Sequence, residues 1–434
     1  MLQFTAIEPD WPEKRPVALR ARDFREVYAG YAAGKAAEQA SRCSQCGVPF
    51  CQVHCPLSNN IPDWLKLTAE GRLEEAYALS QATNNMPEIC GRICPQDRLC
   101  ERNCVIEQSG HGTVTIGAIE KFLTDTAWDE GWVKPLKPKR ERPQHVAVVG
   151  AGPAGLACAE QLRLKGYKVT VFDRHDRAGG LLTYGIPNFK LEKDVVKRRV
   201  KRLADGGIKF KLNCEIGRDV PFAQLRAGYD AVFVAAGAYK ARDAGIPGVP
   251  ALDYLIESNR GSRVLHARDK DVAVIGGGDT AMDCVRTAIR QGANSVTCLY
   301  RRDRDNMPGS LREVINAEEE GVVFEWLTLP KSLETEGVRI SRQRLGLPDA
   351  SGRRAPEEIA RSDFMLKADM VIKALGFDPE PQWTQIIAQD GVFAGGDLVR
   401  GASLVVWAIR DGRVGAENIH QYIAAKTAAM QAAE

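Results

Sequence analysis

Eight of the twelve cysteines form two dense groups ahead of residue 105, and thiols this close in sequence can bind metal. The groups are Cys43, Cys46, Cys51 and Cys55, then Cys90, Cys94, Cys100 and Cys104. Zinc ribbons usually repeat Cys-x2-Cys, and neither group does so throughout. Cys-Pro pairs at 55–56 and 94–95 match the ending of bacterial ferredoxin runs. The pattern favours iron–sulfur clusters, with structural zinc as the alternative.

Two glycine motifs could bind dinucleotide pyrophosphates. In the first, Gly150 allows a tight turn, Gly152 lets phosphate approach the backbone, and Gly155 permits close helix–strand packing. Asp173 ends the next strand, where an acid can bond ribose hydroxyls. The second motif runs Gly276-Gly-Gly278-Asp279-Thr280-Ala281, with alanine in place of the third glycine. Each motif lies between an apolar strand and a helix, so the sequence predicts two nucleotide sites.

The end of the strand after the second motif carries Arg301 and Arg302 where an NAD site usually has an acid. Paired guanidinium groups can bond a 2′-phosphate bidentately, whereas a carboxylate would repel it. These arginines therefore predict NADPH rather than NADH. The alternative is that they form only a solvated basic edge.

The elements that must position these residues fall into an α/β chain. Residues 1–140 are expected to form a helical domain with the cysteines, ending in a proline-rich basic linker over 134–143. Strand–turn–helix–strand units then begin at His145 and again at Asp271. The fold expected is two Rossmann-like nucleotide-binding domains preceded by a helical iron–sulfur domain. The first nucleotide domain is placed at 141–250 and 370–434, with the second at 251–369 inserted.

Composition excludes several other classes. The 434 residues carry a formal charge of +3, which gives no case for nucleic-acid binding. No apolar run is long enough for a membrane span, and the first ten residues contain no signal region. We therefore expect a cytoplasmic protein whose thiols stay reduced, so disulfides are disfavoured. The stretch from Gly180 to Lys190 contains no cysteine, and Cys214 and Cys298 are isolated in the sequence, which disfavours a thiol–disulfide flavoenzyme.

The chain resembles the small (beta) subunits of bacterial NADPH-dependent glutamate synthase over essentially its whole length. The resemblance rests on both cysteine groups, on both glycine motifs, and on the sequence stretches at 179–187, 300–303, 306–310, 373–377 and 402–413. It is also similar to the N-terminal part of dihydropyrimidine dehydrogenase. Segments near 239, 340 and 380 are shorter than the family pattern.

The resemblance implies two [4Fe-4S] clusters with interleaved ligands. One would use Cys43, Cys46, Cys51 and Cys104, and the other Cys55, Cys94, Cys100 and Glu120. Glu120 occupies a position where the dehydrogenase relatives carry glutamine, and Cys90 is left over as a structural thiol. FAD would contact the first glycine motif together with Asp173, Gly180, Leu181, Lys190, Gly396 and Asp397. NADPH would contact Gly276, Gly278, Asp279, Thr280, Arg301 and Arg302.

These cofactors imply an electron-input subunit without a catalytic acid or base of its own. NADPH would deliver a hydride to FAD, and the clusters would carry single electrons onward. The resemblance implies a large (alpha) subunit carrying FMN as partner, which makes glutamate from glutamine and 2-oxoglutarate. The alternatives are an electron-input subunit for another acceptor, such as a pyrimidine reductase or ferredoxin, and a non-catalytic zinc scaffold.

Overall fold

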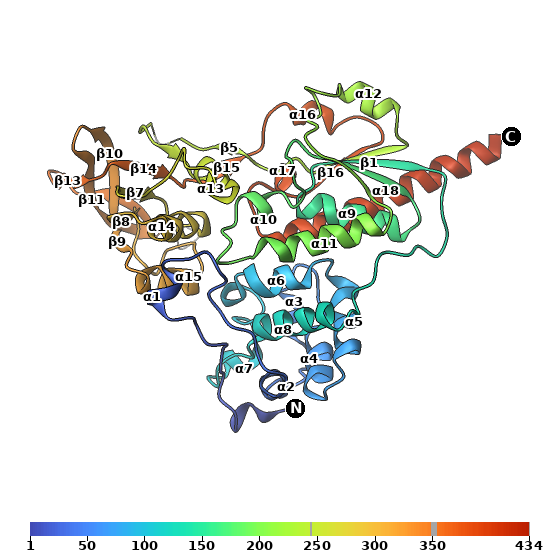
Figure 1. Cartoon of the computed structure of the whole chain (residues 1–434), viewed down its shortest axis with the longest axis horizontal. Coiled ribbons are helices and arrows are strands. Elements are labelled where there is room, and N and C mark those ends of the chain that lie inside the picture. Colours follow the sequence, from blue (N-terminus) through green and yellow to red (C-terminus); the bar gives the residue numbers. More distant parts are fainter. Residues whose placement is uncertain (244, 349–353, 434) are drawn as a thin grey trace.

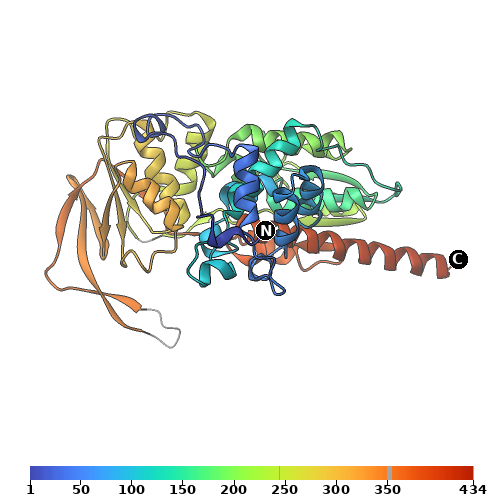
Figure 2. The same cartoon turned by 90° about the horizontal axis from the view of Figure 1, so that it is seen from below.

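The computed structural model describes residues 1–243, 245–348 and 354–433, and it contains three bodies (Figure 1). A helical body lies below two α/β bodies, which stand side by side. Seen from the second direction, an antiparallel sheet projects at one end of the molecule and the C-terminal helix at the other (Figure 2). None of the described helices is long and apolar enough to span a bilayer.

The helical body holds all eight N-terminal cysteines. Its α-helices are α1 (Val17–Arg20), α2 (Ala33–Ser41), α3 (Phe50–Val53), α4 (Ile61–Ala69), α5 (Leu73–Thr83), α6 (Pro87–Ile93), α7 (Val105–Gln108) and α8 (Ile116–Asp129), with short 3-10 turns at Gln3–Thr5 and Gln96–Arg98. The apolar periodicity over 61–82 is split between two helices, because Gly71 adopts a left-handed φ of 75°. Trp64, Ile119 and Leu123 are fully buried at the centre of this body.

The first α/β body is a parallel five-stranded sheet, ordered β16-β4-β1-β2-β3. Its strands are β1 (His145–Val149), β2 (Lys168–Phe172), β3 (Lys209–Lys211), β4 (Ala231–Val234) and β16 (Val392–Ala394). Its helices are α9 (Pro153–Leu164), α10 (Leu181–Tyr184), α11 (Lys193–Asp205), α12 (Phe222–Ala227), α16 (Trp383–Ile386), α17 (Asp397–Arg400) and α18 (Val405–Ala433). Since β16 pairs with β4, a segment near residue 392 completes a sheet whose first strand begins at His145.

The second α/β body is a parallel five-stranded sheet, ordered β6-β14-β7-β8-β9. Its strands are β6 (Val249–Pro250), β7 (Asp271–Ile275), β8 (Ser295–Tyr300), β9 (Val323–Trp326) and β14 (Met370–Lys373), and its helices are α13 (Ala251–Arg260), α14 (Asp279–Gln291) and α15 (Leu311–Glu319). Strands β6 and β14 fall outside the expected limits of 251–369. Strand β14 pairs with β7, and β6 pairs with β14, so the hydrogen bonds of both strands are made within this sheet.

Two chain crossings connect the α/β bodies and lie against each other. Strand β5 (Lys240–Ala241) pairs antiparallel with β15 (Phe377–Asp378). The Arg242 guanidinium contacts the Asp378 carboxylate at 2.7 Å beside this pair. The short segments near 239 and 380 are therefore the two connections between the bodies.

An antiparallel sheet that periodicity did not indicate extends from the second body. It comprises β10 (Thr328–Glu334), β11 (Gly337–Pro348), β12 (Arg354–Glu358) and β13 (Phe364–Lys367). The short segment near 340 lies inside β11, which pairs with the other three strands. Val338 and Ile340 are fully buried, and they anchor this sheet on the parallel one.

Ion pairs join the helical body to both α/β bodies. Glu88 on α6 accepts two hydrogen bonds from Arg199 on α11, at 2.6 and 2.7 Å, and both side chains are fully buried. Asp125 on α8 contacts Arg198 at 2.5 Å. On the other side, Arg312 of α15 reaches Glu101 at 3.1 Å. These contacts fix the cysteine-bearing body against both nucleotide-binding bodies.

Candidate functional site

A cavity of about 300 Å³ lies where the three bodies meet, within the size range of cofactor sites. The first glycine motif forms one wall. A Cβ on Gly150 would stand 2.3 Å from the carbonyl oxygen of Ala235, and one on Gly180 would stand 2.7 Å from the Cα of Gly152. Gly155 lies behind this wall, where a Cβ would overlap the carbonyl oxygen of Gly150. Backbone therefore lines the cavity at the N-terminus of α9, where a pyrophosphate can approach N–H groups.

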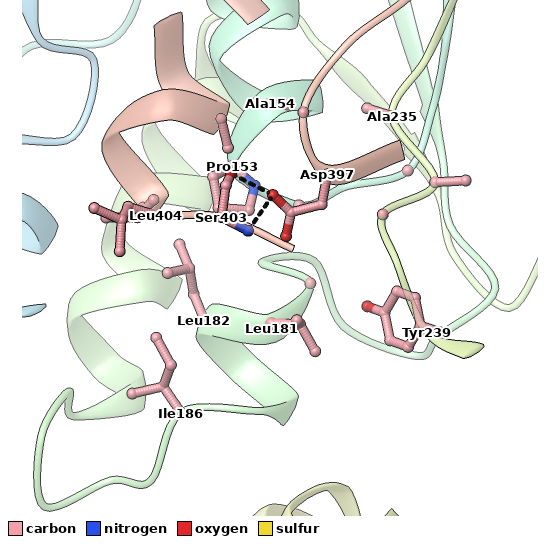
Figure 3. A pocket seen from close by; sticks show the side chains of 18 of the residues that line it. Pro153, Ala154, Leu181, Leu182, Ile186, Ala235, Tyr239, Asp397, Ser403 and Leu404 are labelled. Atoms are coloured by element: carbon pink, nitrogen blue, oxygen red, sulfur yellow. Dashed lines mark hydrogen bonds between the residues drawn. The ribbon is translucent and has the colours of Figure 1, made fainter. Parts of the chain in front are cut away.

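Two carboxylates border this cavity near the first motif. Asp173 accepts hydrogen bonds from the backbone N–H groups of Ala151 at 2.7 Å and His175 at 2.8 Å. Asp397 accepts hydrogen bonds from the Ser403 hydroxyl and backbone N–H, as Figure 3 shows. Burial raises the pKa of Asp397. Both carboxylates are held rigidly with acceptor capacity remaining, as binding of ligand hydroxyl or N–H groups requires.

The rest of the cavity wall is apolar and aromatic. Figure 3 places Leu181, Leu182 and Ile186 below Asp397, with Tyr239 across the opening. Burial raises the pKa of the Tyr239 hydroxyl, and Arg174 lies over its ring at 4.4 Å. An apolar wall with a few fixed polar groups fits a planar aromatic cofactor such as a flavin.

The second glycine motif reaches the same cavity from the opposite side. A Cβ on Gly276 would stand 2.2 Å from the carbonyl oxygen of Ala374, so the turn requires glycine. Asp279 and Thr280, at the start of α14, line the cavity. The Asp279 carboxylate also accepts from the Ser310 N–H at 2.8 Å and contacts Arg98 of the helical body at 3.1 Å. Gly276 and Gly278 belong to the turn behind these residues and do not line the cavity itself.

Arg301 and Arg302 follow β8 and do not border this cavity. The Arg301 side chain is exposed to solvent. Arg302 is 9% exposed, and its buried Nε has no hydrogen-bond partner within the described chain. An unsatisfied buried guanidinium donor is unfavourable, and an anionic group bound here would satisfy it.

A charged cluster joins the two nucleotide-binding bodies at the cavity. The Lys190 ammonium contacts Asp283 at 2.8 Å and Glu313 at 3.6 Å, and all three residues line the cavity. Burial raises the pKa of Asp283 to about 6, although Lys190 opposes this shift. Burial acts to lower the pKa of Lys190, but the two carboxylates outweigh it and raise that pKa. Lys190 is therefore a fixed cation between the bodies.

The first cysteine cavity collects thiols from both sequence groups. Its cysteines are Cys43, Cys46, Cys51 and Cys104. The Gln45 side-chain amide donates to the Cys43 sulfur at 3.3 Å, and the Ser44 hydroxyl lies 3.0 Å from the Cys46 sulfur. Burial raises the pKa of Cys51 to about 12, so a bound cation is needed to hold its thiolate. A cationic cluster would supply that charge.

The second cysteine cavity contains Cys55, Cys90, Cys94, Cys100 and Glu120. The Glu120 carboxylate accepts only long hydrogen bonds, from Asn59 at 3.3 Å, Asn84 at 3.4 Å and Ser80 at 3.5 Å. No cationic side chain among the described residues pairs with Glu120, and burial raises its pKa to about 8. Cys90 lies in this cavity beside Cys94, so it is not remote from the predicted ligands.

The arrangement of the thiols distinguishes a cluster from a single ion. Over the described ranges, no three His, Cys, Asp or Glu side chains are placed to hold one metal ion. A zinc ion draws four thiolates to about 2.3 Å from one point. A [4Fe-4S] cluster instead attaches each thiolate to a different iron, so its ligands surround a wider space. Four cysteines line the first cavity, and four cysteines with Glu120 line the second, which fits clusters better than zinc.

These features define a class: an oxidoreductase with an iron–sulfur domain fused to a two-nucleotide flavoprotein. Residues 20–132 match the family described as dihydropyrimidine dehydrogenase domain II, 4Fe-4S cluster. Residues 144–412 match the pyridine nucleotide-disulphide oxidoreductase family. The cofactors of the class are NADPH, FAD and 4Fe-4S clusters.

The chain belongs to the family of glutamate synthase [NADPH] small chains. It is 60% identical to the small chain of Azospirillum brasilense over 470 aligned positions, covering 99% of this chain and 98% of that one. It is 45% identical to the small chain of Escherichia coli, covering 97% and 98%. Because the first alignment is longer than the 434-residue chain, its relative carries residues that this chain lacks.

Solved structures support the fold. FprA from Mycobacterium tuberculosis in complex with NADPH is 20% identical with a TM-score of 0.58, covering 66% of this chain and 86% of that one. The 2-naphthoyl-CoA reductase complex is 22% identical with a TM-score of 0.52, covering 82% and 52%. The expected α/β class, with a 4Fe-4S domain ahead of a flavoprotein, is confirmed.

Asp283 and Ser403 are among the cavity residues that sequence reasoning did not identify, and Cys90 was expected only as a structural thiol. Asp283 follows the second motif in a helix, where an acid normally indicates a solvated face. The Ser403 hydroxyl donates a hydrogen bond to Asp397 only because the turn after α17 folds back. The resemblance assigns no ligand role to Cys90, although Cys90 lies only four residues before the predicted ligand Cys94.

Proposed function

We propose that this chain is the electron-input subunit of a glutamate synthase, which oxidises NADPH and passes electrons to a large chain. When bound, the cofactors supply hydride transfer from nicotinamide to flavin and one-electron transfer through the clusters. The chain's own residues bind and orient these groups and keep water from the cavity between them. The single observation behind this proposal is 60% identity over 99% of the chain to a glutamate synthase small chain.

The flavin contacts follow from the cavity wall. We assign pyrophosphate binding to Gly150, Gly152 and the N-terminus of α9, and ribose binding to Asp173. Gly180, Leu181, Lys190, Gly396 and Asp397 line the same cavity and are assigned to the flavin. Three features support this assignment: the glycine turn that admits a phosphate, the two carboxylates held by hydrogen bonds, and the apolar wall of the cavity.

The nicotinamide nucleotide is assigned to the second motif. Gly276 and Gly278 form the turn, and Asp279 and Thr280 face the flavin cavity. Arg301 and Arg302 would hold the 2′-phosphate of NADPH. The unpaired Nε of Arg302 supports this role, since a buried donor needs an acceptor.

The cysteine cavities are assigned to two [4Fe-4S] clusters. Cys43, Cys46, Cys51 and Cys104 would hold one. Cys55, Cys94, Cys100 and Glu120 would hold the other, with Cys90 as an unligated neighbour. A buried carboxylate without a cationic partner supports Glu120 as the fourth ligand, because iron would neutralise it. We also propose a cytoplasmic location, where such thiols stay reduced.

The partner is a large chain that carries FMN and forms glutamate from glutamine and 2-oxoglutarate. We expect the purified chain to reduce an artificial acceptor such as ferricyanide with NADPH but to make no glutamate. Adding the large chain should start NADPH-dependent glutamate formation. Steady glutamate formation by this chain alone would contradict the division of labour. If this chain together with the large chain reduced ferricyanide with NADPH but formed no glutamate, the assignment of the large chain as partner would be wrong.

A different acceptor is the second candidate. The chain is 45% identical to a putative oxidoreductase of Escherichia coli named AegA, covering 96% of this chain and 70% of that one. The same flavin and cluster domains therefore occur in a longer chain with a different name. Purification of the native chain from cell extract distinguishes the two candidate functions, because the electron acceptor should co-purify with the chain.

A further inference from the structure

The large cavity and the two cysteine cavities form one continuous series. Cys94 and Gln96 line both the large cavity and the second cysteine cavity. Ile116 lines both cysteine cavities. The large cavity and the first cysteine cavity have no lining residue in common within the described chain. The site of Cys43, Cys46, Cys51 and Cys104 is therefore the end of the series farthest from the flavin cavity.

Exposed apolar side chains surround this terminal site. Val48 and Val53 are 63% and 62% exposed, and Phe50 and Val105 are also exposed. Phe50 and Val105 line the cysteine cavity as well, so their side chains separate the thiols from solvent directly. We call Val48, Phe50, Val53 and Val105 the terminal patch. Large apolar residues gathered on a surface mark an interaction site more often than scattered ones do.

Three of the four patch residues, Val48, Phe50 and Val53, lie in a segment without formal charge, whereas Val105 lies between the exposed Arg102 and Glu107. The sequence contains no Asp, Glu, Lys or Arg from residue 43 to residue 62, although 26% of the whole chain is charged. The exposed neighbours of the patch in this segment are Gly47, His54 and Ser58. The centres of protein interfaces are depleted of charged residues and enriched in apolar ones. The composition of this surface therefore suits a protein partner.

We infer that the terminal patch is the docking surface for the large chain that accepts electrons. This inference rests on the proposed function and adds the face of the molecule at which the partner binds. An acceptor must approach the last site of the series, and the patch covers that site. A second copy of this chain would bring together two terminal sites and no acceptor. A membrane is disfavoured because the segment has no lysine or arginine to meet anionic lipid.

Val48→Glu and Val53→Glu test the inference, because a carboxylate buried in an interface without a partner disfavours binding. Val264→Glu is the matched control, since Val264 is 81% exposed on the second nucleotide-binding body. We expect wild-type iron content and ferricyanide reduction in all three variants. Affinity for the purified large chain should fall by about tenfold or more in the patch variants and remain unchanged in the control.

Hydrogen exchange on the wild-type complex supplies a second readout that needs no variant. Peptides covering residues 47–54 should exchange more slowly after the large chain is added, and peptides around Val264 should not change. Patch variants that bind the large chain like wild type, with no protection at 47–54, would overturn the inference. Loss of self-association with unchanged binding of the large chain would overturn it too, by assigning the patch to a second copy. Failure of wild type itself to bind the large chain would instead refute the proposed function.

Discussion

The choice between NADPH and NADH depends on two arginines, Arg301 and Arg302, so their replacement should change it by a predictable factor. Arg301→Ala with Arg302→Ala removes both guanidinium groups from the end of β8. Hydrogen bonds to charged groups contribute about 1.5–3 kcal/mol each. Arg301 is exposed to water, so we assign it the lower value or less, and Arg302 is 9% exposed with a free donor. A combined loss of about 3 kcal/mol corresponds to a fall of roughly 100-fold in kcat/KM for NADPH.

The assay compares kcat/KM for NADPH and NADH with ferricyanide as acceptor. The value for NADH should change little, because NADH has no 2′-phosphate. Arg304→Ala is the control: this exposed arginine lies on the same loop but pairs with Glu318 at 2.8 Å. We expect the control to keep the preference for NADPH. An unchanged ratio of the two kcat/KM values in the double variant would refute the role assigned to Arg301 and Arg302.

Three further changes test the packing, the charged cluster and the cluster ligands. Glu88→Leu leaves the fully buried Arg199 without its carboxylate, so the free energy of unfolding in urea should fall by about 3–5 kcal/mol, and adding Arg199→Leu should recover part of this loss. Asp283 has a folded pKa of about 6, above its unfolded value, so the stability it contributes is present below about pH 4 and is lost as pH rises through 6. Urea unfolding between pH 4.5 and 7 should therefore show wild type losing stability relative to Asp283→Asn; parallel curves would contradict this. Glu120→Ala should lower the iron content from about eight to about four atoms per chain, whereas Cys90→Ala should leave the iron content unchanged. Loss of iron in Cys90→Ala but not in Glu120→Ala would make Cys90 the ligand.

The two nucleotide units were predictable because their signals are local. A short apolar strand, a glycine turn and a helix follow one another within about 30 residues. Strands β1 and β7 begin at His145 and Asp271, the two residues at which the units are expected to begin. The NADPH, FAD and 4Fe-4S cofactors are likewise confirmed from motifs and resemblance.

Other features depend on contacts between distant segments. Strand β14 has only four residues, and its sheet is decided by pairing with β7, 98 residues earlier at Met370 and Val272. The antiparallel sheet from β10 to β13 has no clear apolar alternation in β11, because two of its buried side chains, Ser341 and Gln343, are polar. Lys190 and Asp283 meet only through the relative placement of two bodies. Local sequence patterns contain no information on such placement.

The ligand sets, the domain limits and the assigned nucleotide contacts remain predictions. For Cys90, short spacing and shared cavity lining argue for proximity to the cluster, whereas the resemblance argues against ligation. Sequence spacing cannot decide between these two possibilities, because Cys90 lies on α6, Cys94 directly follows that helix four residues later, and both line the cavity.

Electrons from NADPH are expected to reach two iron–sulfur clusters inside this one chain. Anaerobic titration of the purified chain with NADPH, together with iron and acid-labile sulfide analysis, tests it most directly. We predict about eight iron and eight sulfide per chain, with flavin bands and broad absorption near about 400 nm that bleach as NADPH is added. A colourless protein, or one that contains zinc and no sulfide, would contradict the account.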